Sequence, residues 1–442
     1  MGKWFLKSVA SLTLGISLVI IVLFSLKPES VQTVLAAGPT FITSTITSNQ
    51  TWVAADSPYI VQTNTVFILN GAIVTIEPGV TVQFQDNSRL QIDNGQLIAV
   101  GTSTNPITFT SSSATPTRGV WQGINFKATK SSTIEHSIIE YGREAIRIDA
   151  TSTQFSIQTN TIRYAGDNNG TIGDGGAILG TKDESFISYN TIYSSETGIY
   201  LNEVADNQIR GNTIYDIDGD CLSLTPGGAD SSNNTIVSNQ IFNCGARGLS
   251  VSDANEGDLN RVNSNVISNT NEAAIYIRNQ DKFFVLGNII YDVPASQGSG
   301  LVFTKTNSSG FAINSGINSN VFCVDGQFEV ENQDTTTLTV EGNWFGTNTP
   351  TVGTEISGAV DFTPSIALAA EPFNNTLPAD GVSTTVITVT MNDGAGHAPP
   401  SGARIVQLST DLGSLSSPTA TLNAQGVATV TLTAPTTFGT AT

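Results

Sequence analysis

The sequence is poor in charge, and basic residues are the scarcer kind. Only 12% of residues are Asp, Glu, Lys or Arg, and 37 acidic residues outnumber 18 basic ones, for a formal net charge of −19. Because such a surface repels a polyanion, nucleic-acid binding is excluded as the main role. The polar surface must come from Asn, Ser, Thr, Gln and Gly. Thr favours strands, Asn and Gly favour turns, and alternating helix and strand patterns are absent, so we expect an all-β protein.

Histidine and cysteine are almost missing. The only histidines are His136 and His397, which leaves little basis for acid–base catalysis by imidazole. The three cysteines are Cys221, Cys244 and Cys323. They form no metal-binding spacing, and an odd number cannot all pair within one chain. We expect buried free thiols, with a Cys221–Cys244 disulfide as the alternative.

Only one stretch is apolar enough to enter a membrane. Residues 9–26 carry no charge, Lys3 and Lys7 precede them, and small residues follow at 34–37. This order predicts that residues 1–37 are a secretory signal or an uncleaved N-terminal anchor. In both cases the rest of the chain is expected to be exported, as a secreted or cell-surface protein that meets the membrane only through this segment.

An irregular repeat fills the middle of the chain. An apolar residue, two positions, Asn, one position and Ile recur with a mean step of about 26 residues. Amide side chains at the same turn of successive coils can donate and accept hydrogen bonds along the stack, so we interpret the column as structural. Its members are His136, in the Asn place of the first copy, and Asn160, Asn190, Asn212, Asn239, Asn265, Asn288, Asn320 and Asn343.

A second block follows each Asn and consists of a small residue, an apolar residue, any residue and an apolar residue. Residues 198–201 and 248–251 are clear examples. Each block has the period of a short strand, and two such strands cannot form a domain alone. Stacked coil on coil, they predict a solenoid.

The segments 76–84, 95–102, 106–110 and 121–126, followed by the Asn-x-Ile coils and closed by residues 342–346, resemble the right-handed parallel β-helix (pectate-lyase-like) proteins that bacteria secrete. We expect this fold over residues 38–366. The resemblance implies little about function, because the fold hosts polysaccharide lyases, hydrolases, epimerases, adhesins and passive stalks.

Residues 367–442 have a different pattern of short strands and turns. The segments 378–383 and 426–432 resemble the bacterial Ig-like repeats of invasin and intimin-type adhesins. We therefore expect an Ig-like β-sandwich, which in those families acts as a spacer. The chain stops within what should be the last strands, so an incomplete domain is expected.

Catalytic motifs of the β-helix enzymes are missing. The Asn-Thr-Asp, Asp-Asp, Gly-His-Gly and Arg-Ile-Lys segments of pectin hydrolases, and the Asp-Pro-His-Asp segment of uronan epimerases, do not occur. Lyases of this fold need acidic Ca²⁺ ligands and a basic residue. The candidates are Asp216, Asp218 and Asp220 for Ca²⁺ and catalysis, with Arg247 on the neighbouring coil. A solvated acidic turn with one surface ion pair is the competing interpretation.

Aromatic residues recur three positions after the column Asn. They are Tyr193, Tyr215, Phe242 and Tyr291, with Ser268 in one coil between the last two. This position should point outward, so stacked rings could form a platform for sugar rings; packing under a turn is the alternative.

Two hypotheses follow. The first is an exported structural or adhesive rod with an Ig-like spacer, which binds polysaccharide or a neighbouring or host cell surface. The second is a carbohydrate-active enzyme of the Ca²⁺-dependent polysaccharide lyase type. The negative net charge argues against this second hypothesis, because it would repel an anionic polysaccharide. No cofactor other than Ca²⁺ is implied.

Overall fold

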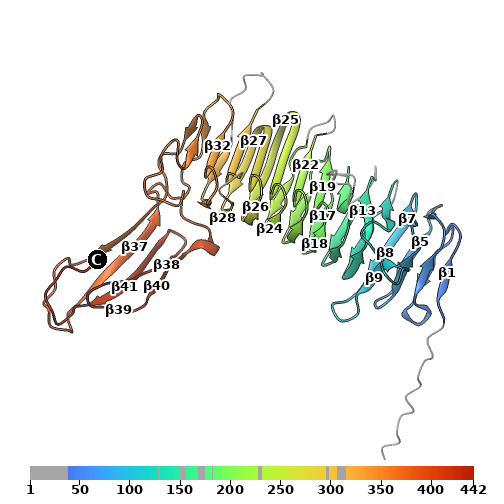
Figure 1. The fold of residues 1–442 in the computed structure, drawn as a ribbon, viewed down its shortest axis with the longest axis horizontal. Coiled ribbons are helices and arrows are strands. Elements are labelled where there is room, and N and C mark those ends of the chain that lie inside the picture. Colours follow the sequence, from blue (N-terminus) through green and yellow to red (C-terminus); the bar gives the residue numbers. More distant parts are fainter. Residues whose placement is uncertain are drawn as a thin grey trace, which may run out of the picture. The chain divides into compact units, whose positions relative to one another are not determined.

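The computed structural model describes residues 38–127, 130–149, 155–167, 175–181, 183–226, 231–294, 298–305 and 315–442, with the backbone alone at 254–258 (Figure 1). The predicted signal or anchor, residues 1–37, lies outside the described residues. Within the described ranges, helices long and apolar enough to cross a bilayer are absent.

The chain is all-β, as predicted, and its body is a parallel β-solenoid of about 11 turns. Each turn contributes short strands to three columns, and each strand pairs in parallel with its equivalents in the coils before and after it. The first column is the 12-stranded sheet of β1 (Thr40–Ile42), β3 (Tyr59–Val61), β6 (Thr81–Phe84), β9 (Ile107–Ser111), β12 (Ser137–Glu140), β15 (Thr161–Arg163), β18 (Thr191–Ser195), β21 (Thr213–Ile217), β24 (Gln240–Cys244), β26 (Val266–Thr270), β28 (Ile289–Tyr291) and β31 (Val321–Cys323).

The other two columns follow along each coil. The next in chain order contains β4 (Thr65–Ile68), β7 (Arg89–Ile92), β10 (Trp121–Phe126), β13 (Gly142–Ile148), β16 (Gly176–Gly180), β19 (Ile199–Asn202), β22 (Leu222–Thr225), β29 (Leu301–Thr304), β32 (Val330–Asn332) and β34 (Ile356–Ser357). The last contains β2 (Gln50–Trp52), β5 (Ile73–Ile76), β8 (Gln96–Val100), β11 (Ser132–Glu135), β14 (Phe155–Gln158), β17 (Phe186–Ser188), β20 (Gln208–Arg210), β23 (Thr235–Val237) and β30 (Gly316–Asn318). The long strands β25 (Leu249–Asn263) and β27 (Ile275–Leu286) pass through both columns, and β33 (Leu338–Thr339) pairs with β35 (Val360–Asp361).

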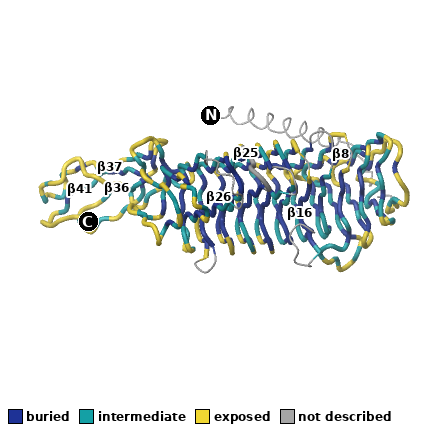
Figure 2. Tube along the Cα trace, turned by 90° about the horizontal axis from the view of Figure 1, so that it is seen from above, coloured by how far each residue is buried: buried dark blue, intermediate teal, exposed yellow. Residues whose placement is uncertain are grey.

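Apolar side chains fill the interior as columns in register. In the first sheet Ile162, Ile192, Ile214 and Ile241 stand opposite one another in successive strands, and each is at most 1% exposed. A slip of one residue would turn such a column out to solvent, so the burial pattern fixes the register. Buried residues run through the stacked strands, while the C-terminal strands carry many exposed residues (Figure 2).

A ladder of buried asparagines closes the turn between the third and first columns. From Asn160 to Asn320, each amide Nδ2 donates to the Oδ1 of the Asn in the next coil at 2.8–3.0 Å and to a backbone carbonyl of the preceding coil at 2.7–3.0 Å. Each Oδ1 also accepts the backbone N–H of the preceding Asn. The ladder runs through Asn160, Asn190, Asn212, Asn239, Asn265, Asn288, Asn320 and Asn343, all at most 1% exposed.

His136 is not part of the ladder, contrary to our expectation. Its neighbour Ser137 is the buried residue that faces Asn160, and the Ser137 N–H donates to the Asn160 Oδ1 at 2.9 Å. His136 adopts a positive φ of 46°, as do the residues that precede the ladder in later coils, such as Thr159 and Tyr189. It forms the left-handed turn that aims the next residue inward.

A second amide ladder lies between the other two columns of strands and was not expected. Asn207 donates to Asn234, Asn234 to Asn260, and Asn260 to Gln280, over 2.7–3.1 Å. Each of these asparagines precedes a residue of the first ladder by five positions, and this offset is the sequence signal that would have found them.

The C-terminal part is antiparallel. A four-stranded sheet has the order β36 (Ala367–Pro372), β37 (Thr384–Asn392), β41 (Val427–Thr433) and β39 (Ser414–Leu415), and β38 (Ile405–Gln407) pairs with β40 (Thr419–Thr421). Val389, Ala420 and Val430 share one small apolar core across the two sheets.

Single turns of 3-10 helix occupy Ala54–Asp56 and Ser401–Ala403.

The cysteines differ from the free, buried thiols that we expected. Cys221 and Cys244 form a disulfide with a Cα–Cα distance of 5.6 Å, so the alternative is the correct one for this pair. Cys323 is free but exposed. The disulfide joins successive coils at the corner after the first column, and that adjacency is created by coil stacking rather than by local sequence.

Asn239→Ala should destabilise the solenoid by at least about 3 kcal/mol, because it leaves Asn212 donors and the Ile209 carbonyl unpaired in the interior. Urea unfolding of the full chain measures this. The control is Gln208→Ala at an exposed position beside the second ladder, expected within about 0.5 kcal/mol of the parent protein. Equal midpoints for both variants would show that the ladder contributes no stability.

Titration of thiols in denaturant without reductant should find one reactive group per chain, that of Cys323, because Cys221 and Cys244 are bonded to each other. Three equivalents in protein secreted into an oxidising medium would contradict the disulfide.

Candidate functional site

The aromatic residues three positions after the ladder form a stacked column on the outer face of the first sheet. The rings of Tyr193 and Tyr215 lie 5.0 Å apart with planes 7° apart, and those of Tyr215 and Phe242 lie 4.9 Å apart with planes 5° apart. All three side chains are half-buried. The parallel register sets this spacing, since equivalent residues of neighbouring strands lie about 4.8 Å apart. Tyr291 belongs to the same column and is 38% exposed, but Ser268 separates it from Phe242.

A charged residue closes one end of the aromatic column. Arg163 lies one strand before Tyr193 in register. Its guanidinium donates to the Tyr193 hydroxyl at 2.9 Å and pairs with Glu140 at 2.7 Å. Burial lowers the pKa of Arg163, but the hydrogen bonds to Tyr193 and Glu140 outweigh it, so the net direction is upward and the side chain stays charged.

A polar column runs beside the rings, one residue further along each strand. Asp216, Asn243, Asn269 and Asp292 all have positive φ values of 48–56°. The Asn243 Nδ2 donates to the Asp216 Oδ1 at 2.8 Å, and the Asn269 Nδ2 donates to the Asn243 Oδ1 at 2.7 Å. Amide and carboxylate groups therefore flank the ring column at the same coil spacing.

An open cleft of about 460 Å³ lies where the aromatic column is interrupted. Phe242 and Tyr291 line it on two sides, Ser268 lies between them, and Asn243, Asn269 and Asp292 supply its polar wall. The cleft therefore combines ring faces with hydrogen-bonding groups, which is the composition of a small-molecule site.

The three aspartates proposed as Ca²⁺ ligands and catalytic groups face different partners. Asp216 binds Asn243 in the polar column, and exposed Asp218 forms an ion pair with Arg118. Asp220 is only 4% exposed, and burial raises the pKa of its carboxyl although the Arg247 N–H, 3.0 Å away, lowers it. The expected alternation holds for Asp216 and Asp218, which are both exposed, but Asp220 is buried and does not share their side of the turn.

Arg247 is next to Asp220, as predicted, but the contact is made by its backbone. The guanidinium instead lies 3.1 Å from Glu272 and 4.1 Å from the centre of the Tyr276 ring. Among the described residues, groups of three or more His, Cys, Asp or Glu side chains that could hold a metal ion are absent.

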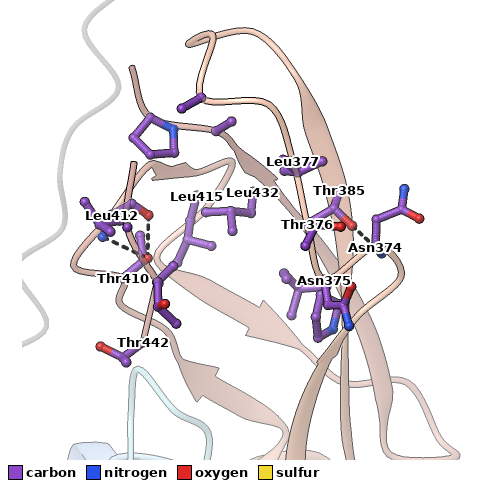
Figure 3. Close-up of a pocket in the computed structure, with 18 of the residues that line it drawn as sticks. Asn374, Asn375, Thr376, Leu377, Thr385, Thr410, Leu412, Leu415, Leu432 and Thr442 are labelled. Carbon is purple, nitrogen blue, oxygen red and sulfur yellow. Dashed lines mark hydrogen bonds between the residues drawn. The ribbon is translucent and has the colours of Figure 1, made fainter. Parts of the chain in front are cut away.

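A larger apolar cleft of about 660 Å³ opens in the C-terminal sandwich, where Leu377, Leu412, Leu415 and Leu432 surround it (Figure 3). No titratable side chain lines it. We interpret this cleft as the loosely filled interior of the sandwich, because it offers neither acid–base groups nor charge.

One carboxyl has a strongly perturbed pKa and stands apart from the aromatic column. Burial of Glu329, which is 7% exposed, together with the nearby Glu355 and Asp325, raises its pKa to about 7. The Val324 N–H, 3.1 Å from its Oε2, opposes this rise. With no basic side chain among these neighbours, the group is a stability determinant rather than one half of an acid–base pair.

Three family models match the sequence. Residues 109–256 match a right-handed β-helix region, residues 44–168 match a pectate-lyase-like β-helix domain, and residues 363–442 match domain 3 of invasin. The matches confirm the right-handed β-helix and the invasin-type C-terminal domain expected from the sequence. No curated protein matches the chain significantly.

Solved structures resemble the fold at low identity. The Dettilon tailspike protein (gp208) is 14% identical with a TM-score of 0.39, covering 85% of this chain and 82% of that one. The periplasmic alginate epimerase AlgG is 13% identical with a TM-score of 0.41, covering 71% and 84%. An alginate lyase from Paenibacillus sp. str. FPU-7 is 15% identical with a TM-score of 0.30, covering 72% and 100%. At these values, the likenesses carry no information about activity.

Sequence reasoning placed the four aromatic residues in one column but missed the polar column and the closing Arg163. The polar column has a sequence signal, since Asp216, Asn243, Asn269 and Asp292 all stand four positions after a ladder Asn. Small polar residues that tolerate positive φ at that place indicate a repeated left-handed turn.

Glu329→Gln should raise the free energy of unfolding at pH 8 by up to roughly 3 kcal/mol and should leave it almost unchanged at pH 4. Because the folded-state pKa is raised from 4.5 to about 7, the carboxyl favours folding below pH 4.5, and this contribution is lost as the pH rises through 7. Urea midpoints at the two pH values measure the difference. An equal effect of the substitution at pH 4 and pH 8 would contradict the raised pKa.

Proposed function

We propose that the protein is an exported, non-catalytic surface rod that binds glycans along its aromatic column. The observation that carries this proposal is the pairing of two outer columns in register. Half-buried rings stack at 4.9–5.0 Å, and amides and carboxylates run directly beside them. The outward edges of the stacked rings and the uncovered face of Phe242 offer apolar contact to a sugar, and amide or carboxylate oxygens accept its hydroxyl protons.

A location outside the cell is supported by two features remote from the column. The C-terminal residues 363–442 match an invasin domain, and residues 1–37 have the order of a secretory signal in the sequence. A solenoid of stacked coils presents an extended surface suited to binding, and the sandwich follows it in the chain.

The alternative, a Ca²⁺-dependent polysaccharide lyase, has less support. Its three proposed carboxylates are held by separate partners, and the guanidinium of its proposed base is engaged by Glu272. A lyase centre needs a metal site and a basic group that face the same substrate. We therefore infer that the acidic turn and Arg247 stabilise the corner between coils.

The purified full chain should bind members of a glycan array without degrading them, and Tyr215→Ala should weaken binding at least about tenfold because it interrupts the stacked rings. Tyr200→Ala, in β19 outside the column, is the matched control and should bind like the parent protein.

The same preparation should be incubated with uronic-acid polymers and Ca²⁺ while ultraviolet absorbance follows unsaturated products. Product formation that disappears in Asp218→Ala would overturn the proposal and favour the lyase. Absence of any glycan binding would also overturn it.

A further inference from the structure

We propose that the interruption of the aromatic column at Ser268 is a slot for one pyranose ring of a neutral oligosaccharide. The ring would lie between the faces of Phe242 and Tyr291. This inference rests on the proposed glycan-binding function and names the subsite and the substrate class.

The size of the slot follows from the strand register. Phe242 is opposite Ser268, and Ser268 is opposite Tyr291, in three successive strands of one parallel sheet. Two strand spacings separate the outer residues by about 10 Å. In the preceding coils a ring occupies every spacing, as the 4.9 Å contact of Tyr215 with Phe242 shows. One ring is therefore missing at Ser268, and a ligand ring of similar thickness would continue the stack.

The two ends of the three-ring stack differ in a way that directs a ligand to Ser268. At Tyr193, Arg163 binds the hydroxyl, and Tyr164 packs edge-on with ring centres 6.4 Å apart. At Phe242, the next residue in the column is Ser268, which is only 8% exposed and whose side chain is too small to cover the ring. The face of Phe242 that points toward Ser268 therefore borders the open cleft.

The wall beside the slot offers hydrogen bonds to a polyhydroxylated ring. The Asn269 Nδ2 is engaged by Asn243, whereas its Oδ1 has no hydrogen-bond partner among the described residues. Asp292 contributes a carboxylate to the same wall. Stacking on two faces with acceptors along one edge suits a pyranose, whose hydroxyls project from the rim of the ring.

Charge selects neutral sugars over uronic acids. Asp292 lies in the wall, Asp216 stands three coils before it in the same polar column, and the chain has a net charge of −19. No Lys or Arg lines the cleft. A carboxylated sugar would therefore be repelled, while a neutral hexose or N-acetylhexosamine would not.

The test uses the full chain and three probes, namely cellohexaose, chitohexaose and hexagalacturonate, with affinities measured by isothermal titration calorimetry. At least one neutral probe should bind, and hexagalacturonate should bind about tenfold more weakly or not at all. Ser268→Phe should weaken neutral-probe binding at least about tenfold, because the new ring fills the slot and completes the stack.

Matched variants separate filling of the slot from damage to the fold. Tyr200→Ala, in β19 outside the column, leaves the slot intact and should keep the affinity within about twofold of the parent. Tyr291→Ala removes one wall at an exposed position and should lose about tenfold. The unfolding midpoint of Ser268→Phe should match or exceed that of the parent protein, since the added ring packs on Phe242.

The outcomes distinguish this inference from the function on which it rests. If Ser268→Phe binds as tightly as the parent while Tyr215→Ala loses binding, the proposed slot at Ser268 is overturned and the proposed glycan binding along the aromatic column is supported. A preference for hexagalacturonate over both neutral probes would overturn the assigned substrate class. If neither neutral probe nor any array glycan binds the parent protein, the proposed function and the slot fail together.

Discussion

The hydrogen-bonded ladder of buried asparagines is the constraint on which the rest of the structure depends. Each side chain joins its own coil to the coils before and after it, through both amide hydrogens and the carbonyl oxygen. A buried amide is costly unless it is fully paired. The ladder therefore fixes which residue of each coil occupies the turn, whatever the length of the excursions between turns.

The position of the ladder Asn determines which side chains of the first sheet point inward and which point outward. Two positions after the ladder the side chain points inward, as Ile192 and Ile214 do, and three positions after it points outward, as Tyr193 and Tyr215 do. An interior requirement for hydrogen bonds thus places a column of rings on the outside at strand spacing. The binding face proposed for this protein is a consequence of the register, with its chemistry set by which residue stands at the third and fourth positions.

Much of the fold could be predicted because it is periodic in sequence, whereas features that depend on contacts between coils could not. The Asn-x-Ile spacing gave the solenoid and its core, but it assigned His136 where Ser137 faces inward, because a left-handed residue precedes each ladder position. Pairing of Cys221 with Cys244 depends on how coils of unequal length stack. The burial of Asp220 depends on its contact with the Arg247 N–H of the next coil, and the gap at Ser268 depends on how the rings of neighbouring coils stack.

Hydrogen–deuterium exchange of the parent protein, resolved to the ladder turns, tests the central claim most directly. Backbone N–H groups of Asn160 through Asn320 donate to side-chain oxygens of the next coil, although they lie in turns rather than strands. The ladder predicts that these amides exchange as slowly as the core strands, through unfolding of the solenoid alone. Exchange within seconds, as in exposed loops, would show that the asparagines are not hydrogen-bonded from coil to coil and would contradict the account.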